Sequence, residues 1–124
     1  MYIAIDFDGT CVTHEYPNIG KDIGAIPVLK QLVEDGHKLI LYTMRSDKTL
    51  KEAVQWFKDN EIQLYGINRN PSQKSWTNSP KVYANIYIDD AAIGVPLVNY
   101  NSDLWPHRPY VCWTSMYDYI NNKI

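Results

Sequence analysis

The sequence predicts an α/β fold built around a mostly parallel β-sheet. Short, continuous apolar runs alternate along the 124 residues with segments whose apolar residues recur at helical spacing, which is the pattern of β-α-β units. The apolar runs also lack the strict alternation of half-exposed strands, as is typical of parallel strands buried on both faces. The length fits one domain, residues 1–124.

The first third of the chain predicts a strand, a helix and a second strand. Residues 2–6 (YIAID) are apolar and predict the first buried strand. Residues 11–23 are mixed and are broken by proline and glycine, which predicts a loop or small hairpin. Residues 24–35 place apolar side chains at helical spacing, with Pro27 in the first turn, where proline is tolerated. The run KLILYT at 38–43 predicts the second buried strand.

The remaining elements continue the alternation. A second helix is predicted at 47–60, and the polar residues 66–81, with two prolines and one glycine, predict a long loop with one short turn. ANIYIDD at 84–90 predicts a third buried strand. A short fourth strand at 94–100 and a closing helix at 114–122 complete the chain. Strand, helix, strand, helix, strand is the order of a Rossmann-like three-layer sandwich.

Polar side chains stand at the ends of the three predicted buried strands. Asp6 and Asp8 end the first strand, Thr43 ends the second, and Asp89 and Asp90 end the third. Carboxylates after strands also form turns and caps, but the carboxyl ends of parallel strands meet at one edge of a sheet. Four converging acids repel one another unless a cation lies among them. Oxygen-only ligands of this kind favour Mg²⁺.

The spacing of the first two acids points to chemistry beyond metal binding. A metal ion does not require carboxylates at positions i and i+2, whereas catalysis can use one as a nucleophile and the other to move protons. A carboxylate nucleophile can carry a phosphoryl group as an aspartyl phosphate, with a cation and a lysine neutralising the phosphate oxygens. The pair of acids at this edge of the sheet is therefore compatible with phosphoryl transfer.

The composition of the chain argues against nucleic-acid and membrane partners. The net charge of −2 argues against a dedicated nucleic-acid-binding surface. No apolar run approaches the roughly 18 residues of a membrane span, and two acids interrupt the apolar start where a signal peptide would need its core. The two cysteines, Cys11 and Cys112, lack metal-binding spacing and fit free thiols in a reducing compartment. We therefore expect a cytoplasmic protein without a membrane partner.

Three segments together resemble a known family. DFDGT at 6–10 resembles the DxDxT first motif of the haloacid dehalogenase (HAD) superfamily of phosphohydrolases. The apolar run ending in Thr43 is similar to the second motif of that superfamily, and YIDD at 87–90 resembles its fourth motif. The motifs follow the family order and span nearly the whole chain. The resemblance implies a Mg²⁺-dependent phosphatase that works through an aspartyl phosphate.

The resemblance also implies roles for the residues of the first and second motifs. Asp6 would be the nucleophile and a metal ligand. Asp8 would be the general acid and base, and its backbone carbonyl would bind the metal. Thr43 would hydrogen-bond the transferring phosphoryl group. Thr10 would orient the first loop beside the substrate, and Arg45, just after the second motif, would line the substrate wall.

The third and fourth motifs supply the remaining implied residues. Asp89 and Asp90 would hold Mg²⁺, Asp90 either directly or through water. The third motif requires a lysine before the fourth. Lys81, eight residues ahead of Asp89, is the preferred candidate, and Lys74 in the same polar loop is the alternative.

The spacing between motifs implies that the protein lacks a cap domain. Only 32 residues separate Thr10 from Thr43, and the distance from Thr43 to Lys81 is little longer. A capless site admits a phosphorylated small molecule or a macromolecular end, or is covered by a second subunit of an oligomer. A phosphotransferase of the same fold and a non-catalytic interaction or signalling module are the alternative functions.

Overall fold

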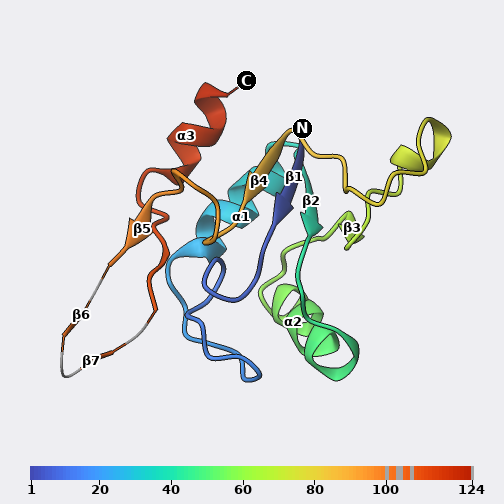
Figure 1. Ribbon diagram of the computed structural model, residues 1–124. Coiled ribbons are helices and arrows are strands. Elements are labelled where there is room, and N and C mark those ends of the chain that lie inside the picture. The colour runs from blue at the N-terminus through green and yellow to red at the C-terminus, as the bar shows by residue number, and fades with distance from the viewer. Residues whose placement is uncertain (100, 103–104, 107, 124) are drawn as a thin grey trace.

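A four-stranded parallel sheet forms the centre of the molecule (Figure 1). The computed structural model describes residues 1–99, 101–102, 105–106 and 108–123. The sheet has the order β3-β2-β1-β4; its strands are β1 (Tyr2–Ile5), β2 (Lys38–Leu41), β3 (Gly66–Ile67) and β4 (Ile86–Ile88). The predicted α/β fold with a mostly parallel sheet is confirmed. No helix in the described ranges is long and apolar enough to cross a membrane.

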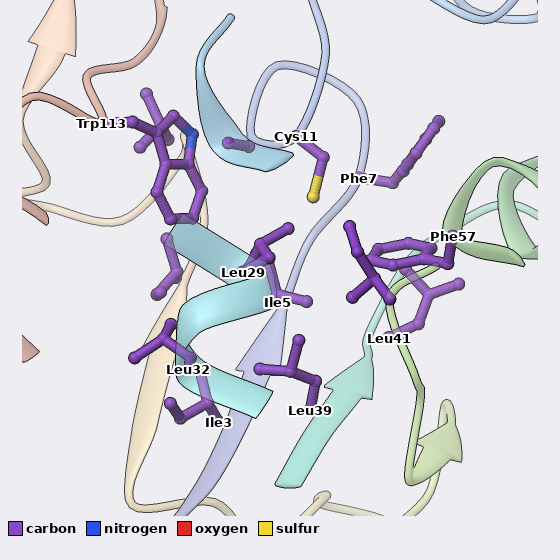
Figure 2. Packing of buried hydrophobic residues seen from close by; sticks show 14 of the residues in the cluster. Ile3, Ile5, Phe7, Cys11, Leu29, Leu32, Leu39, Leu41, Phe57 and Trp113 are labelled. Atoms are coloured by element: carbon purple, nitrogen blue, oxygen red, sulfur yellow. The ribbon is translucent and has the colours of Figure 1, made fainter. Parts of the chain in front are cut away.

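The helices build one core against one face of the sheet. Helices α1 (Ala25–Glu34), α2 (Asp47–Asp59) and α3 (Met116–Asn122) all contribute buried side chains to the same apolar cluster. Alternate residues of a strand point to the same face, so every second side chain of β1 and β2 meets the helices (Figure 2). Residues at the centre of this core are Ile3, Ile5, Leu29, Leu32, Leu39, Leu41 and Phe57.

The second face of the sheet is covered by a loop, where the three-layer pattern led us to expect a helix. The loop joins β3 to β4 and contains a single 3₁₀ turn, η1 (Gln73–Ser75). The Tyr87 hydroxyl donates a hydrogen bond to the Val82 carbonyl at 2.5 Å. The ring centroid of Tyr83 lies 5.7 Å from that of Tyr2 in β1. Aromatic side chains and loop backbone therefore form the third layer.

Two strands differ from the sequence prediction. β3 was predicted as part of a loop, but it pairs with β2 in parallel; two residues are too few to show any periodicity. The fourth strand predicted at 94–100 shortens to β5 (Leu97–Val98), and its last residue, Tyr100, lies outside the described residues. β5 pairs antiparallel with β8 (Tyr110–Val111), outside the central sheet. Strands β6 (Asn101–Ser102) and β7 (Trp105–Pro106) pair with each other.

The C-terminal segment braces the loop that follows β1. The Val111 backbone N–H donates to the Gly9 carbonyl at 2.9 Å. The Trp113 indole N–H donates to the Thr10 carbonyl at 2.7 Å, and Trp113 is buried in the core. Residues more than one hundred positions apart thus fix the turn that carries Asp6 and Asp8 out of the sheet.

Candidate functional site

Three carboxylates meet at the carboxyl ends of two neighbouring strands. β1 and β4 run parallel, with Ile5 paired to Ile88, so the residues that follow them emerge side by side. One oxygen from each of Asp6, Asp89 and Asp90 lies within 4.8 Å of the other two. The structure therefore brings together three of the four predicted acidic metal ligands.

A tight turn after β1 holds this cluster in place. Gly9 has a φ of +79°, and a Cβ atom there would lie 2.5 Å from Oδ2 of Asp90, so both the backbone conformation and the space require glycine. Thr10 is fully buried. Its hydroxyl donates to Oδ2 of Asp6 at 2.9 Å and accepts the Asp90 backbone N–H at 3.0 Å. Thr10 thus holds the first loop against both acids, and, being fully buried, it does not line the open cavity over them.

The crowded carboxylates perturb one another's ionisation. Burial, and then the charge of Asp89, raises the pKa of Asp6 to about 8. Burial is also the main cause of the raised pKa of Asp90. This is the expected behaviour of like charges gathered out of water. All the possible metal ligands in the cluster are oxygen atoms. Repulsion among the carboxylates destabilises their charged forms, and a bound cation would relieve it. The cluster therefore fits a hard divalent cation such as Mg²⁺.

The carboxylate of Asp8 turns away from the three-acid cluster toward Arg45. Nε and Nη2 of Arg45 donate to the two carboxylate oxygens of Asp8, both at 2.7 Å. This bidentate pair is deeply placed, with the side chains of Arg45 and Asp8 1% and 12% exposed. Only the backbone carbonyl of Asp8 is then left for a metal, which is the ligand the sequence analysis assigned to it.

Arg45 holds the site together and is also one of the residues that line the open cavity over the acids. Its remaining N–H groups donate to the carbonyls of Pro17, Asn18 and Thr49 at 2.8–3.3 Å. All five donors of the guanidinium are thereby used inside the protein. In this arrangement the guanidinium has no donor left to offer a substrate, and the substrate contact of Arg45 stays a prediction.

Two aromatic rings enclose the same guanidinium. Its central carbon lies 5.1 Å from the ring centroid of Phe7 and 5.2 Å from that of Tyr16, within the range of cation–π attraction. Arg45 therefore joins the first motif and the loop around Tyr16 to the start of α2. Asp8 gains a fixed position from this arrangement.

An open cavity of about 470 Å³ lies over the acids. Asp6, Asp8 and Thr43 line it together with Asp89 and Asp90. Thr43 is held on both sides, because its backbone N–H donates to Oδ1 of Asn68 at 2.8 Å and its hydroxyl accepts the Arg45 backbone N–H at 3.1 Å. Further residues of the lining are His14, Tyr16, Met44, Arg45, Ala91 and Arg108.

Neither candidate lysine lines this cavity. The Lys81 ammonium lies 5.7 Å from the ring centroid of Tyr87, on the second face of the sheet, and Lys74 lines a separate cavity in the β3–β4 loop. Asn85 hydrogen-bonds Tyr2 at the amino end of β1. Lys81 therefore approaches β4 from the end opposite the acids, although it is close to Asp89 in sequence.

A basic pair, His14 and Arg108, stands at the acidic cavity, and the sequence analysis did not identify Arg108. Nη1 of Arg108 lies 3.1 Å from Nε2 of His14, and both residues line the cavity. The positive charge of Arg108 also acts on Asp90, where it opposes the rise in pKa. Arg108 sits in a polar C-terminal segment without a recognisable motif, so no local pattern marked it.

Comparison with known proteins identifies one informative relative. No family model and no curated protein matches the chain. A solved structure, that of a conserved protein from Bacteroides thetaiotaomicron, is 34% identical to it with a TM-score of 0.78. The match covers 100% of this chain and 92% of the other.

Proposed function

This chain belongs to the same protein family as the conserved Bacteroides thetaiotaomicron protein, and we propose that it is a Mg²⁺-dependent phosphohydrolase. Its substrate is a phosphate monoester of a small molecule or a macromolecular end, and its intermediate is an aspartyl phosphate on Asp6. The observation that carries the proposal is the meeting of Asp6, Asp89 and Asp90 beside Asp8 in an open cavity. The motif resemblance to the HAD superfamily supports the same chemistry.

In the first step the Asp6 carboxylate attacks phosphorus and the bond from phosphorus to the alcohol oxygen breaks. Asp8, protonated and released from its bidentate pair with Arg45, donates a proton to that leaving oxygen, so the alcohol departs neutral. In the second step Asp8 takes a proton from water, which attacks the phosphoryl group and releases phosphate and the free Asp6 carboxylate. Thr43 donates a hydrogen bond to a phosphoryl oxygen in both steps.

Mg²⁺ would be held by Asp6, Asp89 and the Asp8 backbone carbonyl, with Asp90 in support, and would neutralise charge on the phosphoryl oxygens. Both cysteines are free thiols, consistent with the cytoplasmic location that forms part of the proposal.

The direct test is phosphate release from a panel of phosphate esters with Mg²⁺ or with EDTA. We expect release with Mg²⁺ and its loss in EDTA.

We also expect Mg²⁺ to raise the melting temperature, since a ligand that binds only the folded state adds about 2.7 kcal/mol to the unfolding free energy at one hundred times its Kd. Asp89→Asn removes one ligand and one crowded charge, so it should be at least as stable without metal and gain much less from Mg²⁺. Full activity in EDTA, or equal gains for both proteins, would contradict the proposal.

Arg108 takes the place of the third-motif lysine in this proposal. We expect Arg108→Gln to lower kcat/KM by about 10²-fold, the usual loss when one donor to a developing negative charge is removed. Lys81→Gln should have a smaller effect, because Lys81 lies on the second face of the sheet. Lys123→Gln, at the exposed end of α3, is the matched control for net charge. A larger loss from Lys81→Gln than from Arg108→Gln would return the role to Lys81.

A further inference from the structure

The loop between β3 and β4, residues 68–85, is long and almost without regular structure, yet it has a fixed shape. Loops of this length in compact domains are usually functional or disordered. Gln73 is 8% exposed, and its amide N–H groups donate to the carbonyls of Ser79 and Lys81 at 3.1 and 2.8 Å. Its amide oxygen accepts the Tyr83 backbone N–H at 2.9 Å. One buried side chain thus ties three points of the loop together.

A second buried amide completes this framework around a cavity. Asn70 is 4% exposed; it donates to the Tyr83 carbonyl at 3.0 Å and accepts the Ser72 backbone N–H at 2.9 Å. The cavity has a volume of about 340 Å³, and every residue that lines it belongs to positions 68–82. The loop therefore surrounds an open cavity whose shape is held by two buried amide side chains.

The charge of this segment is opposite to that of the catalytic acids. From Ile62 to Ile88 the sequence contains no aspartate or glutamate but three cations, Arg69, Lys74 and Lys81. Arg69 and Lys74 line the cavity, and neither forms an ion pair with another residue of the described ranges. In a chain of net charge −2, this acid-free segment attracts anions.

One hydrogen bond connects the lining of the loop cavity with that of the catalytic pocket. Asn68 lines the loop cavity, and its side-chain oxygen accepts the backbone N–H of Thr43, which lines the acidic pocket. A ligand that extends past Asn68 and Thr43 would place one group at Asp6 and another among the loop cations.

We infer that the loop cavity binds a second anionic group, a phosphate or a carboxylate, of the same ester whose scissile phosphate lies at Asp6. The link to Asp6 rests on the proposed phosphohydrolase function, whereas binding of an oxyanion by the loop cavity does not. The substrate class is therefore a phosphate monoester with a further negative charge, either a bisphosphate or a phosphorylated hydroxy acid.

The kinetic test compares three substrates, namely p-nitrophenyl phosphate, a diol bisphosphate and a phosphorylated hydroxy acid. We expect the wild type to favour one or both doubly anionic substrates in kcat/KM by about tenfold or more, the worth of one charge-assisted hydrogen bond. Arg69→Gln/Lys74→Gln should bring that ratio close to one. Lys30→Gln/Lys58→Gln removes the same charge from exposed positions on α1 and α2 and should keep the ratio. No preference in the wild type, or an unchanged ratio in the loop variant, would overturn the inference.

A binding test separates this inference from the proposed function. Backbone amide shifts of the metal-free protein are followed by NMR during titration with inorganic phosphate and, separately, acetate. We expect saturable shifts within residues 68–82 that are lost in Arg69→Gln/Lys74→Gln and kept in Lys30→Gln/Lys58→Gln. Such shifts without hydrolysis of any ester would retain the anion site and remove the proposed function. Mg²⁺-dependent hydrolysis with no shifts, or with equal shifts in the loop variant, would remove the anion site and retain the function.

Discussion

Asp6→Asn should abolish phosphate release from every ester and, at the same time, stabilise the metal-free protein at neutral pH. Activity is lost because the amide cannot attack phosphorus and no covalent phosphoenzyme forms. Stability rises because the folded protein buries the Asp6 carboxyl group beside Asp89, which raises its pKa to about 8. An asparagine places no charge there, while its side-chain oxygen still accepts the Thr10 hydroxyl.

The stability of the metal-free protein should depend on pH, because the folded and unfolded states bind the Asp6 proton with different affinities. Between about pH 4 and about pH 8 the unfolded chain releases the Asp6 proton and the folded protein keeps it, so the unfolding free energy of the metal-free wild type falls as pH rises through this window. Asp6→Asn lacks the part of this fall that comes from Asp6, so its stability should decrease less than that of the wild type. Denaturant unfolding of both proteins in EDTA from pH 5 to 9 measures the difference.

Asp118→Asn is the matched control, since Asp118 is an exposed carboxylate on α3. It should follow the wild-type curve throughout. If Asp6→Asn shows the same fall as the wild type, the titrating proton belongs to another group, and Asp90, whose pKa is also raised, is the next to test. Normal turnover by Asp6→Asn would remove it as the nucleophile.

The fold and the acidic cluster could be predicted because both depend on local patterns. Continuous apolar runs mark buried strands, and the acids directly follow two of them, so their convergence needs only the rule that parallel strands end at one edge. The glycine of DFDGT is also explained locally, by its positive φ. Its close approach to Asp90, 81 positions away, appears only in the folded chain.

The partners of the cationic side chains could not be predicted, because they depend on contacts between distant segments. Arg45 follows Thr43 by two residues, and this spacing implied a place beside the substrate. Its side chain also donates to Asp8 and to the carbonyls of Pro17 and Asn18, all more than 25 positions away. Lys81 is near Asp89 in sequence but enters from the other end of β4. Arg108 reaches the site through the C-terminal segment. No periodic pattern in the sequence predicts in which direction a long arginine or lysine side chain will point.

Arg45→Met should destabilise the protein by about 3–5 kcal/mol, the range observed when one partner of a buried ion pair is removed. The Asp8 carboxylate, 12% exposed, is then left without its bidentate partner, and the carbonyls of Pro17, Asn18 and Thr49 lose a donor. Denaturant unfolding measures the loss. Arg69→Met, at an exposed arginine, should change the unfolding free energy by no more than about 0.5 kcal/mol.

The double variant Asp8→Asn/Arg45→Met tests whether the uncompensated charge causes the loss. Replacing both charges of a buried pair is far less harmful than removing one, so the double variant should recover a large part of the stability that Arg45→Met loses. Neither variant should hydrolyse esters at the wild-type rate, because Arg45→Met leaves Asp8 unrestrained and the double variant removes its acid group.

Arg45→Lys keeps the positive charge but cannot form the bidentate pair, so it should retain more stability than Arg45→Met and still lower kcat. If Arg45→Lys keeps the wild-type kcat, or if the double variant is no more stable than Arg45→Met, then Arg45 does not act through the position of Asp8.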